Sequence, residues 1–345
     1  MIRNLGWSVL LSLAALTLTG WAAAAEEPPA RGPAEFYANS LHFTNRGIEY
    51  VYAKEQGGLE RIVGLSASEL GCIKAKCHVT SCDDCHRKEV DGKAVYTADR
   101  GRILEACARC HPVEKDDPDV HFRKGMTCLD CHTAREIHGD GTAVNTYQQP
   151  GVLEVRCRKC HANISRSVSH TIHDDKLDCS ACHTREVVTC FNCHVDARRA
   201  AGKDVEIPLK GMLFLVNHDG KVTTANLLSY VSQKKTMITV AAYFSHSIRK
   251  EGRTCVECHG SGLVRSVADG SLQLARFEGG TLKGAEGVIP LVEGMRWDLP
   301  FLDYVDGSWT PLAPAGEPLV NFAPFTTPLS REQLAKLEKP KGTGR

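Results

Sequence analysis

The 345-residue chain is poor in aromatic residues, which make up 6% of it. It has no excess of charge of either sign, with 42 Lys and Arg against 41 Asp and Glu, and no low-complexity stretch. These absences exclude a disordered acidic tail, a collagen and a strongly basic nucleic-acid-binding module. Cysteine, in contrast, is abundant, with 16 residues. An ordinary cytosolic enzyme of this size carries far fewer, so the cysteines dominate the chemistry that the sequence predicts.

Long apolar runs are also lacking, apart from one at the amino terminus. Arg3 precedes an uncharged run of 21 residues from Leu5 to Ala25, which ends in four alanines. This layout predicts a signal peptide over residues 1–25, cleaved after Ala25. A retained membrane anchor is the alternative, because about 20 apolar residues span a bilayer. We expect an exported protein, periplasmic or extracellular, in an oxidising compartment.

Seven times the chain repeats the motif Cys-x-x-Cys-His. Random placement at this composition would give about 0.03 such motifs, so the repeat is a strong signal for covalent haem attachment. The motifs are Cys82, Cys85 and His86; Cys107, Cys110 and His111; Cys128, Cys131 and His132; Cys157, Cys160 and His161; Cys179, Cys182 and His183; Cys190, Cys193 and His194; and Cys255, Cys258 and His259.

The chemistry of haem c explains this spacing. Two thiols three residues apart reach the two vinyl groups of one porphyrin, and the adjacent imidazole binds the iron. Zinc sites and iron–sulfur clusters need converging sets of cysteines, and disulfides need pairs of cysteines, but none of these requires a histidine after every second cysteine. We therefore predict haem c at each motif.

The two remaining cysteines form a wider version of the motif. Cys72 and Cys77 are separated by four residues and followed by His78. The alternative, a local disulfide, would close a short and strained loop. With this motif the prediction is eight covalently attached haems, and all sixteen cysteines are used.

Each iron in a low-potential electron carrier usually has a second imidazole ligand, but only seven of the 15 histidines lie outside the motifs. Seven cannot serve eight irons, so at least one iron must take Met126, Met212, Met237, Met295, a lysine, water or another donor. His170 and His173 share a helix face and are expected to serve different haems. His218 lies in a predicted turn and is not expected to be a ligand. The predicted second ligands are His42, His121, His138, His170, His173 and His246.

The spacing of the motifs predicts the organisation of the chain. Residues 26–71 form an amino-terminal arm and cap, residues 72–194 a seven-haem core, and residues 195–345 a region with the eighth haem and a wrapping segment. At one motif per 18 or so residues the haems would replace an ordinary hydrophobic core. We therefore predict mostly short α-helices and coil wrapped around a chain of haems, with a few β-strands in the carboxy-terminal third. Ser330 opens a capping box that predicts a terminal helix up to Lys339.

These motifs resemble those of the multihaem c-type cytochromes of bacterial and archaeal respiration. The stretch from His170 to His194, with His246 and the last motif, is similar to the octahaem branch that includes tetrathionate reductase-like and hydroxylamine oxidoreductase-like enzymes. The chain has no Cys-x-x-Cys-Lys motif, which marks the catalytic haem of some relatives, and it is short for that branch.

Two functions follow from this resemblance. The first is electron transfer, in single steps along closely packed haems, between a quinol-linked donor and a terminal reductase or an outer-membrane conduit. A soluble shuttle, a conduit component and a homo-oligomer or conductive filament are all compatible with it. The alternative is an octahaem oxidoreductase that acts on a small nitrogen or sulfur oxyanion at a haem without a second histidine. Haem propionates would make the surface acidic, so no nucleic-acid partner is expected.

Overall fold

The computed structural model describes residues 35–44, 46–71, 79, 81–111, 119–202, 205–314 and 316–339. The predicted signal peptide and the motif of Cys72, Cys77 and His78 lie outside the described residues. Within the part of the chain that is described, no helix has the length and apolar character needed to cross a membrane.

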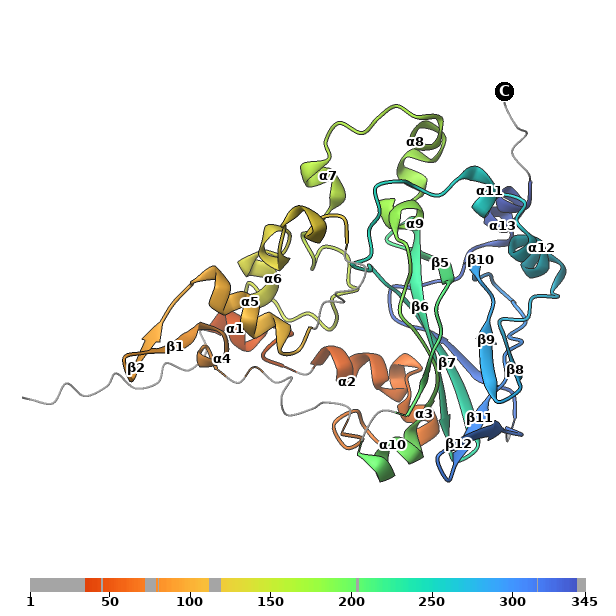
Figure 1. The fold of residues 1–345 in the computed structure, drawn as a ribbon, viewed down its shortest axis with the longest axis horizontal. Helices are drawn as coiled ribbons and strands as arrows, with labels where there is room; N and C mark the ends of the chain where they lie inside the picture. Colours follow the sequence, from red (N-terminus) through yellow and green to blue (C-terminus); the bar gives the residue numbers. More distant parts are fainter. Residues whose placement is uncertain are drawn as a thin grey trace, which may run out of the picture. The chain divides into compact units, whose positions relative to one another are not determined.

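The largest element of the fold is a seven-stranded sheet, which corrects the prediction of a helix-and-coil protein. Three consecutive antiparallel strands form its centre: β5 (Met212–His218), β6 (Lys221–Ser232) and β7 (Lys235–Ala242). Figure 1 shows these three strands side by side. The chain is therefore a mixed α/β protein.

Four further strands join this centre. One edge of β6 pairs with β5 over its first half and with β3 (Thr189–His194) over its second half. A short strand, β4 (Ile207–Pro208), extends the sheet beyond β3. Two parallel strands close the other sides, β10 (Gly287–Pro290) on β5 and β13 (Leu319–Phe322) on β7.

The sheet is buried on both faces. On one face Leu227 and Val231 of β6 belong to the main apolar core, together with residues such as Phe191 and Phe214. On the other face Leu228 and Tyr230 of β6 pack in a second apolar cluster. Strands buried on both faces are nearly continuous apolar runs. The prediction was wrong because it assumed that haems would replace the core along the whole chain, whereas residues 205–339 bury an ordinary core of side chains.

The remaining strands form three hairpins. They are β1 (Arg87–Val90) with β2 (Lys93–Tyr96), β8 (Ala275–Glu278) with β9 (Thr281–Gly284), and β11 (Leu302–Val305) with β12 (Ser308–Pro311). The first hairpin falls inside residues 72–194, for which mostly helix and coil were predicted.

The helices are short, as predicted. In order, the α-helices are α1 (Glu35–Ala38), α2 (Arg46–Tyr52), α3 (Glu60–Val63), α4 (Asp83–His86), α5 (Arg100–Ala108), α6 (Ala134–His138), α7 (Cys157–Cys160), α8 (Val168–His173), α9 (Cys179–His183), α10 (Val195–Ala201), α11 (Cys255–Cys258), α12 (Gly262–Asp269) and α13 (Arg331–Glu338). Single 3-10 turns are η1 (Lys54–Gln56), η3 (Phe122–Lys124), η4 (Cys128–Asp130) and η5 (Asp174–Lys176). The capping box at Ser330 begins α13, which confirms the predicted terminal helix.

Candidate haem sites

Six of the motifs have the same local fold. Each lies in a helical turn, in which the histidine is one turn beyond the first cysteine. In five of them the backbone N–H of the histidine donates a hydrogen bond to the carbonyl oxygen of the first cysteine, and the sixth forms helix α9. The turn places the first cysteine and the histidine on the same side of the backbone, as one porphyrin requires.

The motif of Cys107 shows that this turn does not need a helix along its whole length. Helix α5 ends at Ala108, so Cys110 and His111 lie in the turn that follows it. The carbonyl oxygen of Cys107 nevertheless accepts hydrogen bonds from the backbone N–H of Cys110 at 3.2 Å and of His111 at 2.9 Å. Cys110 is half-buried, like Cys107. The second motif therefore keeps the helical turn although its helix has ended.

Each of these six motif histidines faces a histidine from outside the motifs. The ring centroids of every such imidazole pair are about 6 Å apart, and each of the two rings comes from a different segment of the chain. The imidazole pairs are His42–His111 at 6.4 Å, His86–His138 at 5.9 Å, His121–His161 at 6.0 Å, His132–His246 at 6.2 Å, His170–His183 at 6.3 Å and His173–His259 at 6.1 Å.

The separation within these pairs fits a metal ion held between two rings. An imidazole–metal bond is about 2 Å long, and the ring centre lies about 1 Å further out, so two ligating rings have centres about 6 Å apart. Two imidazoles in direct contact could lie closer. No group of three or more His, Cys, Asp or Glu side chains that could hold a metal ion is found among the described residues. The imidazoles therefore form pairs, and two imidazoles are the number that one haem iron would take.

Hydrogen bonds fix the orientation of many of these rings. Nδ1 of His86, His183 and His259 donates to a backbone carbonyl oxygen, that of Thr97, Arg249 and Lys336 respectively, at distances of 2.9 to 3.1 Å. A proton on Nδ1 leaves Nε2 as the ring nitrogen that can bind a metal. His170 and His173 make the same bond to the carbonyl oxygens of Ser165 and Ser169.

A buried carboxylate orients His121. Oδ1 of Asp119 accepts a hydrogen bond from His121 Nδ1 at 2.7 Å and another from the His121 backbone N–H at 2.8 Å. Oδ2 accepts from the backbone N–H of Ile248 at 2.9 Å, and only 6% of the Asp119 side chain is exposed. The pair of His121 and His161 therefore has a negative charge directly behind one ring.

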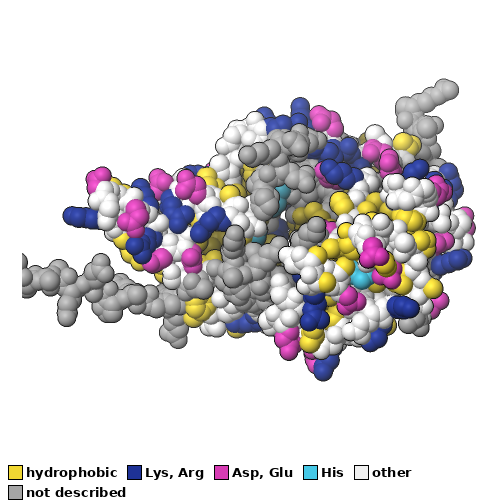
Figure 2. All heavy atoms as spheres, turned by 60° about the horizontal axis from the view of Figure 1, so that its bottom comes forward, with side chains coloured by type: hydrophobic (Ala, Val, Ile, Leu, Met, Phe, Trp, Pro, Cys, Tyr) yellow, Lys and Arg dark blue, Asp and Glu magenta, His cyan; other side chains and the backbone are white. Residues whose placement is uncertain are grey.

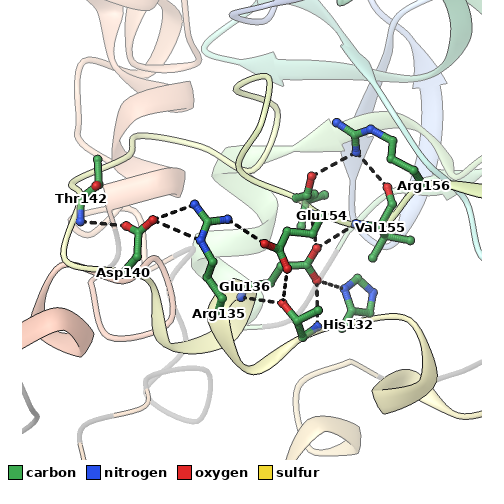
Figure 3. Close-up of polar contacts among 10 residues, drawn as sticks. His132, Arg135, Glu136, Asp140, Thr142, Glu154, Val155 and Arg156 are labelled. Atoms are coloured by element: carbon green, nitrogen blue, oxygen red, sulfur yellow. Dashed lines mark hydrogen bonds and ion pairs between the residues drawn. The ribbon is translucent and has the colours of Figure 1, made fainter. Parts of the chain in front are cut away.

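A second buried carboxylate orients His132, as Figure 3 shows. Oε2 of Glu136 accepts from His132 Nδ1 at 2.9 Å, and Oε1 accepts from the backbone N–H groups of Glu154 and Val155. The Glu136 side chain is 1% exposed. Arg135, which directly precedes Glu136, forms ion pairs with Asp140 and Glu154. These contacts hold the segment after α6 close to Glu154.

His42 is held by a tyrosine. The Tyr147 hydroxyl lies 2.7 Å from Nδ1 of His42 and donates to the carbonyl oxygen of Glu136 at 3.2 Å. Burial lowers the pKa of His42 to about 4, so the ring is neutral at pH 7. A neutral imidazole is the form that binds a metal.

Thiols of successive motifs lie close together. Burial raises the pKa of Cys85, Cys107 and Cys131. In each case a thiol of the next motif adds to the increase: Cys107 acts on Cys85, Cys128 on Cys107, and Cys160 on Cys131. Cys157 and Cys179 share a hydrogen bond. Burial raises the pKa of Cys258 to about 11, with a contribution from Cys182. The six motifs therefore form one continuous row in the order of the sequence, in which the motif of Cys179 is followed by that of Cys255.

Two arginines lie beside the end of this row. Nε and Nη2 of Arg249 and Nε of Arg253 are buried and have no hydrogen-bond partner among the residues that the structure describes. Arg249 Nη2 lies 3.7 Å from Glu257, and burial lowers the pKa of Arg253. Buried guanidinium nitrogens without a partner are suited to an anionic group such as a haem propionate.

The motif of Cys190, Cys193 and His194 has a different fold, because it forms strand β3. Both ring nitrogens of His194 are engaged within the protein: Nε2 donates to Asp303 at 2.8 Å, and Nδ1 accepts from the Ala197 backbone N–H at 3.2 Å. Among the described residues no second imidazole faces this ring.

His218 was predicted to lie in a turn, but it is the last residue of β5, directly before the turn to β6. Its Nδ1 donates to the carbonyl oxygen of Phe325 at 2.8 Å, and its ring contacts Phe244. The structure thus brings together all six histidines that were predicted as second ligands, whereas it holds His218 elsewhere.

Sequence reasoning missed the side chains behind the imidazoles, which are Asp119, Glu136 and Tyr147. Glu136 lies four residues after His132, a spacing that places both side chains on one helical face and was available as a signal. Tyr147 is far from His42 in the sequence and had no such signal. Comparison with known protein families, with curated proteins and with solved structures finds no match to this chain.

Proposed function

We propose that this protein is a multihaem c-type cytochrome that carries single electrons along a row of haems. The observation that supports this function most directly is the set of six imidazole pairs. Each pair combines a motif histidine with a histidine from elsewhere in the chain, at the separation that an iron between the two rings requires.

The residues present fit haem c. Each pair of motif cysteines would hold one porphyrin by thioether bonds, and the two imidazoles of each pair would bind the iron. Such a haem supplies one-electron oxidation and reduction. The chain contributes the tautomer of those imidazoles whose Nδ1 hydrogen bonds are described above. Thiols such as Cys85, Cys107 and Cys258 are partly buried, whereas Cys82 and Cys157 are exposed. Arg249 and Arg253 would bind propionates.

Conduction is supported by the continuity of the row. Neighbouring motifs lie close enough for each thiol to affect the pKa of the next, from Cys85 to Cys258. Porphyrins attached at these positions would be close neighbours, so electrons could pass from one to the next. On the face drawn in Figure 2, acidic and basic side chains are interspersed, which suits partners that dock briefly, such as a quinol-linked donor and a terminal reductase or outer-membrane conduit.

The second candidate is an oxidoreductase that reduces a small nitrogen or sulfur oxyanion. It is favoured by the ligand count, because six of the seven non-motif histidines are used in pairs and His218 is held by Phe325. A haem at Cys72, Cys77 and His78 would therefore receive no second imidazole from the described residues other than His218. Such an iron could bind substrate.

The test is to purify the mature protein and determine the haem content of each motif peptide and the spin state of each iron. The expected result is covalent haem at the six motifs with an imidazole pair, and low-spin iron at each of them. A colourless protein, or one with the mass of the bare polypeptide, would overturn the proposal. An additional high-spin iron that binds nitrite or cyanide and turns over with reduced dye would favour the oxidoreductase.

A further inference from the structure

The tautomer of His194 is the reverse of the one that the imidazole pairs show. The Asp303 carboxylate can only accept a hydrogen bond, so its 2.8 Å contact with Nε2 of His194 places the proton on Nε2. Nδ1 accepts from the backbone N–H of Ala197 at 3.2 Å and so caps the first turn of α10. In His86, by contrast, Nδ1 donates to a backbone carbonyl and leaves Nε2 for a metal. Both nitrogens of His194 are therefore used within the protein.

Strand β3 also sends the thiols and the imidazole of its motif to opposite faces of the sheet. Cys193 pairs with Tyr230 and packs beside it in the second apolar cluster, and Cys190 lies two register steps earlier on the same face. His194 pairs with Val231, whose side chain belongs to the main core on the other face. One porphyrin needs both thiols at its edge and the imidazole against its iron, on one side of the backbone. This motif does not meet that requirement.

The backbone of the motif is held in the extended form by contacts outside it. The backbone N–H of His194 donates to the carbonyl oxygen of Val205 at 2.9 Å, whereas in five helical motifs the corresponding N–H donates to the first cysteine. Asn192, fully buried and with φ +52, occupies the bulge of the strand. Its backbone N–H donates to Ser229 and its side-chain oxygen accepts from the backbone N–H of Leu302. A helical turn at this motif would break all three bonds.

Side chains already fill the space on both faces of β3. On one face Phe191, the residue after the first cysteine, is fully buried in the main core. On the other face Leu59 and Ile62 belong to the apolar cluster against which Cys193 packs. A porphyrin attached to this motif would have to displace one of the two clusters. The residues of β3 therefore do not fit haem c.

We propose that this motif binds no haem, and that His194 is instead a structural residue that ties β3 and α10 to β11. The inference rests on the proposed function and limits its extent, because it removes one of the seven Cys-x-x-Cys-His motifs from the row of haems. The imidazole pairs agree with it: α8 links the motif of Cys179 directly to that of Cys255, and the motif between them in the sequence is left out.

Peptide mapping of the whole purified protein tests the absence of haem. Trypsin releases this motif in the peptide of residues 186–198 and the helical motif of Cys179 in the adjoining peptide of residues 177–185. We expect one haem on the second peptide and the mass of the bare polypeptide for the first. Haem on both peptides would overturn this inference and leave the cytochrome intact. Haem on no motif peptide would overturn the cytochrome, and with it the contrast between the two motifs.

A matched pair of variants tests the structural role of His194. His183→Ala removes an imidazole of a pair, so electron paramagnetic resonance should show one low-spin ferric signal replaced by a high-spin signal. His194→Ala should leave the spectrum unchanged and lower the melting temperature by several degrees, because the contacts with Asp303 and Ala197 are lost. A new high-spin signal in His194→Ala, or an unchanged melting temperature, would overturn the assignment. Peptide mapping of the original protein decides the haem content even if His194→Ala does not fold.

Discussion

His173 and His259 face each other with their ring centroids 6.1 Å apart and their planes within 10° of parallel. One helical turn earlier on α8, His170 faces His183 at 6.3 Å. A single six-residue helix thus supplies imidazoles to two different motifs. It links the motif of Cys179 to that of Cys255 and bypasses the motif of Cys190, which lies between them in the sequence.

If each imidazole pair binds one haem iron as proposed, replacement of one histidine outside the motifs should change one haem only. In His246→Ala the ring that faces His132 is removed, so we expect one low-spin ferric signal to be replaced by a high-spin signal of equal spin count. Electron paramagnetic resonance of the oxidised protein measures both. The matched control is His218→Ala, which removes a histidine that faces no other imidazole among the described residues and should leave the spectrum unchanged. If the two variants behave alike, the pairing is wrong.

If haems are bound as proposed, the buried carboxylates behind His121 and His132 should lower the reduction potentials of the two haems in the middle of the row. A carboxylate that accepts a hydrogen bond from Nδ1 makes the imidazole a more basic ligand of the iron and so favours the ferric state. Asp119→Asn and Glu136→Gln should each raise one potential by about 60 mV, the equivalent of a tenfold change for one electron. Potentiometric titration followed by absorbance measures the shift.

Asp303→Asn is the control for these two substitutions. Asp303 also accepts a hydrogen bond from a motif histidine, His194. If that histidine binds no iron, the potentials of all the haems should be unchanged. A shift as large as that of Glu136→Gln would place a haem at His194.

The bulge in β3 should depend on Asn192. This residue has φ +52, a conformation that Asn and Gly tolerate, and its side chain accepts a hydrogen bond from the buried Leu302 N–H. Asn192→Gly loses the hydrogen bond at a cost of about 1 kcal/mol. Asn192→Val adds backbone strain of about 1–3 kcal/mol. The melting temperature should therefore be lower for Asn192→Val than for Asn192→Gly, and lower for both than for the original protein. Equal melting temperatures of the two variants would contradict the bulge.

Through its contacts with Arg135 and Thr142, Asp140 should stabilise the folded protein at neutral pH, and this stabilisation should be lost in acid. The backbone N–H of Thr142, and then Arg135, lower the pKa of Asp140 to about 2. Because the folded pKa is below the ordinary value of about 4, the stabilisation is present above pH 4 and is lost as the pH falls towards 2. Asp140→Asn should flatten the pH dependence of the melting temperature in this window, and an unchanged slope would contradict the contact.

The sequence selected the histidines of the imidazole pairs but not the partner of each. Six of the seven histidines outside the motifs were selected, because only His218 lay in a predicted turn, and the structure places each of the six opposite a motif histidine. The partner of each one was not predictable, because the pairs join distant segments. His121, for example, lies near the motif of Cys128, but it faces His161.

The fold was predicted less well, because haem density was taken as a property of the whole chain. A few strands in the carboxy-terminal third were predicted, but a central sheet that joins β3, β10 and β13 to β5, β6 and β7 was not. The parallel pairs of this sheet join strands that are far apart in the sequence, and no local pattern reports such contacts.

The sequence by itself determined the covalent chemistry that is available to this protein: where the thiols lie, which imidazole follows them, and how many histidines remain. These are local properties, fixed by spacings of a few residues. Only the tertiary structure decided which imidazoles face each other and that one motif of identical spacing is a strand. A strand sends successive side chains to opposite faces, whereas a helical turn brings residues three and four apart to the same face. The same five-residue pattern therefore meets the geometric requirement of a porphyrin in α9 and fails it in β3.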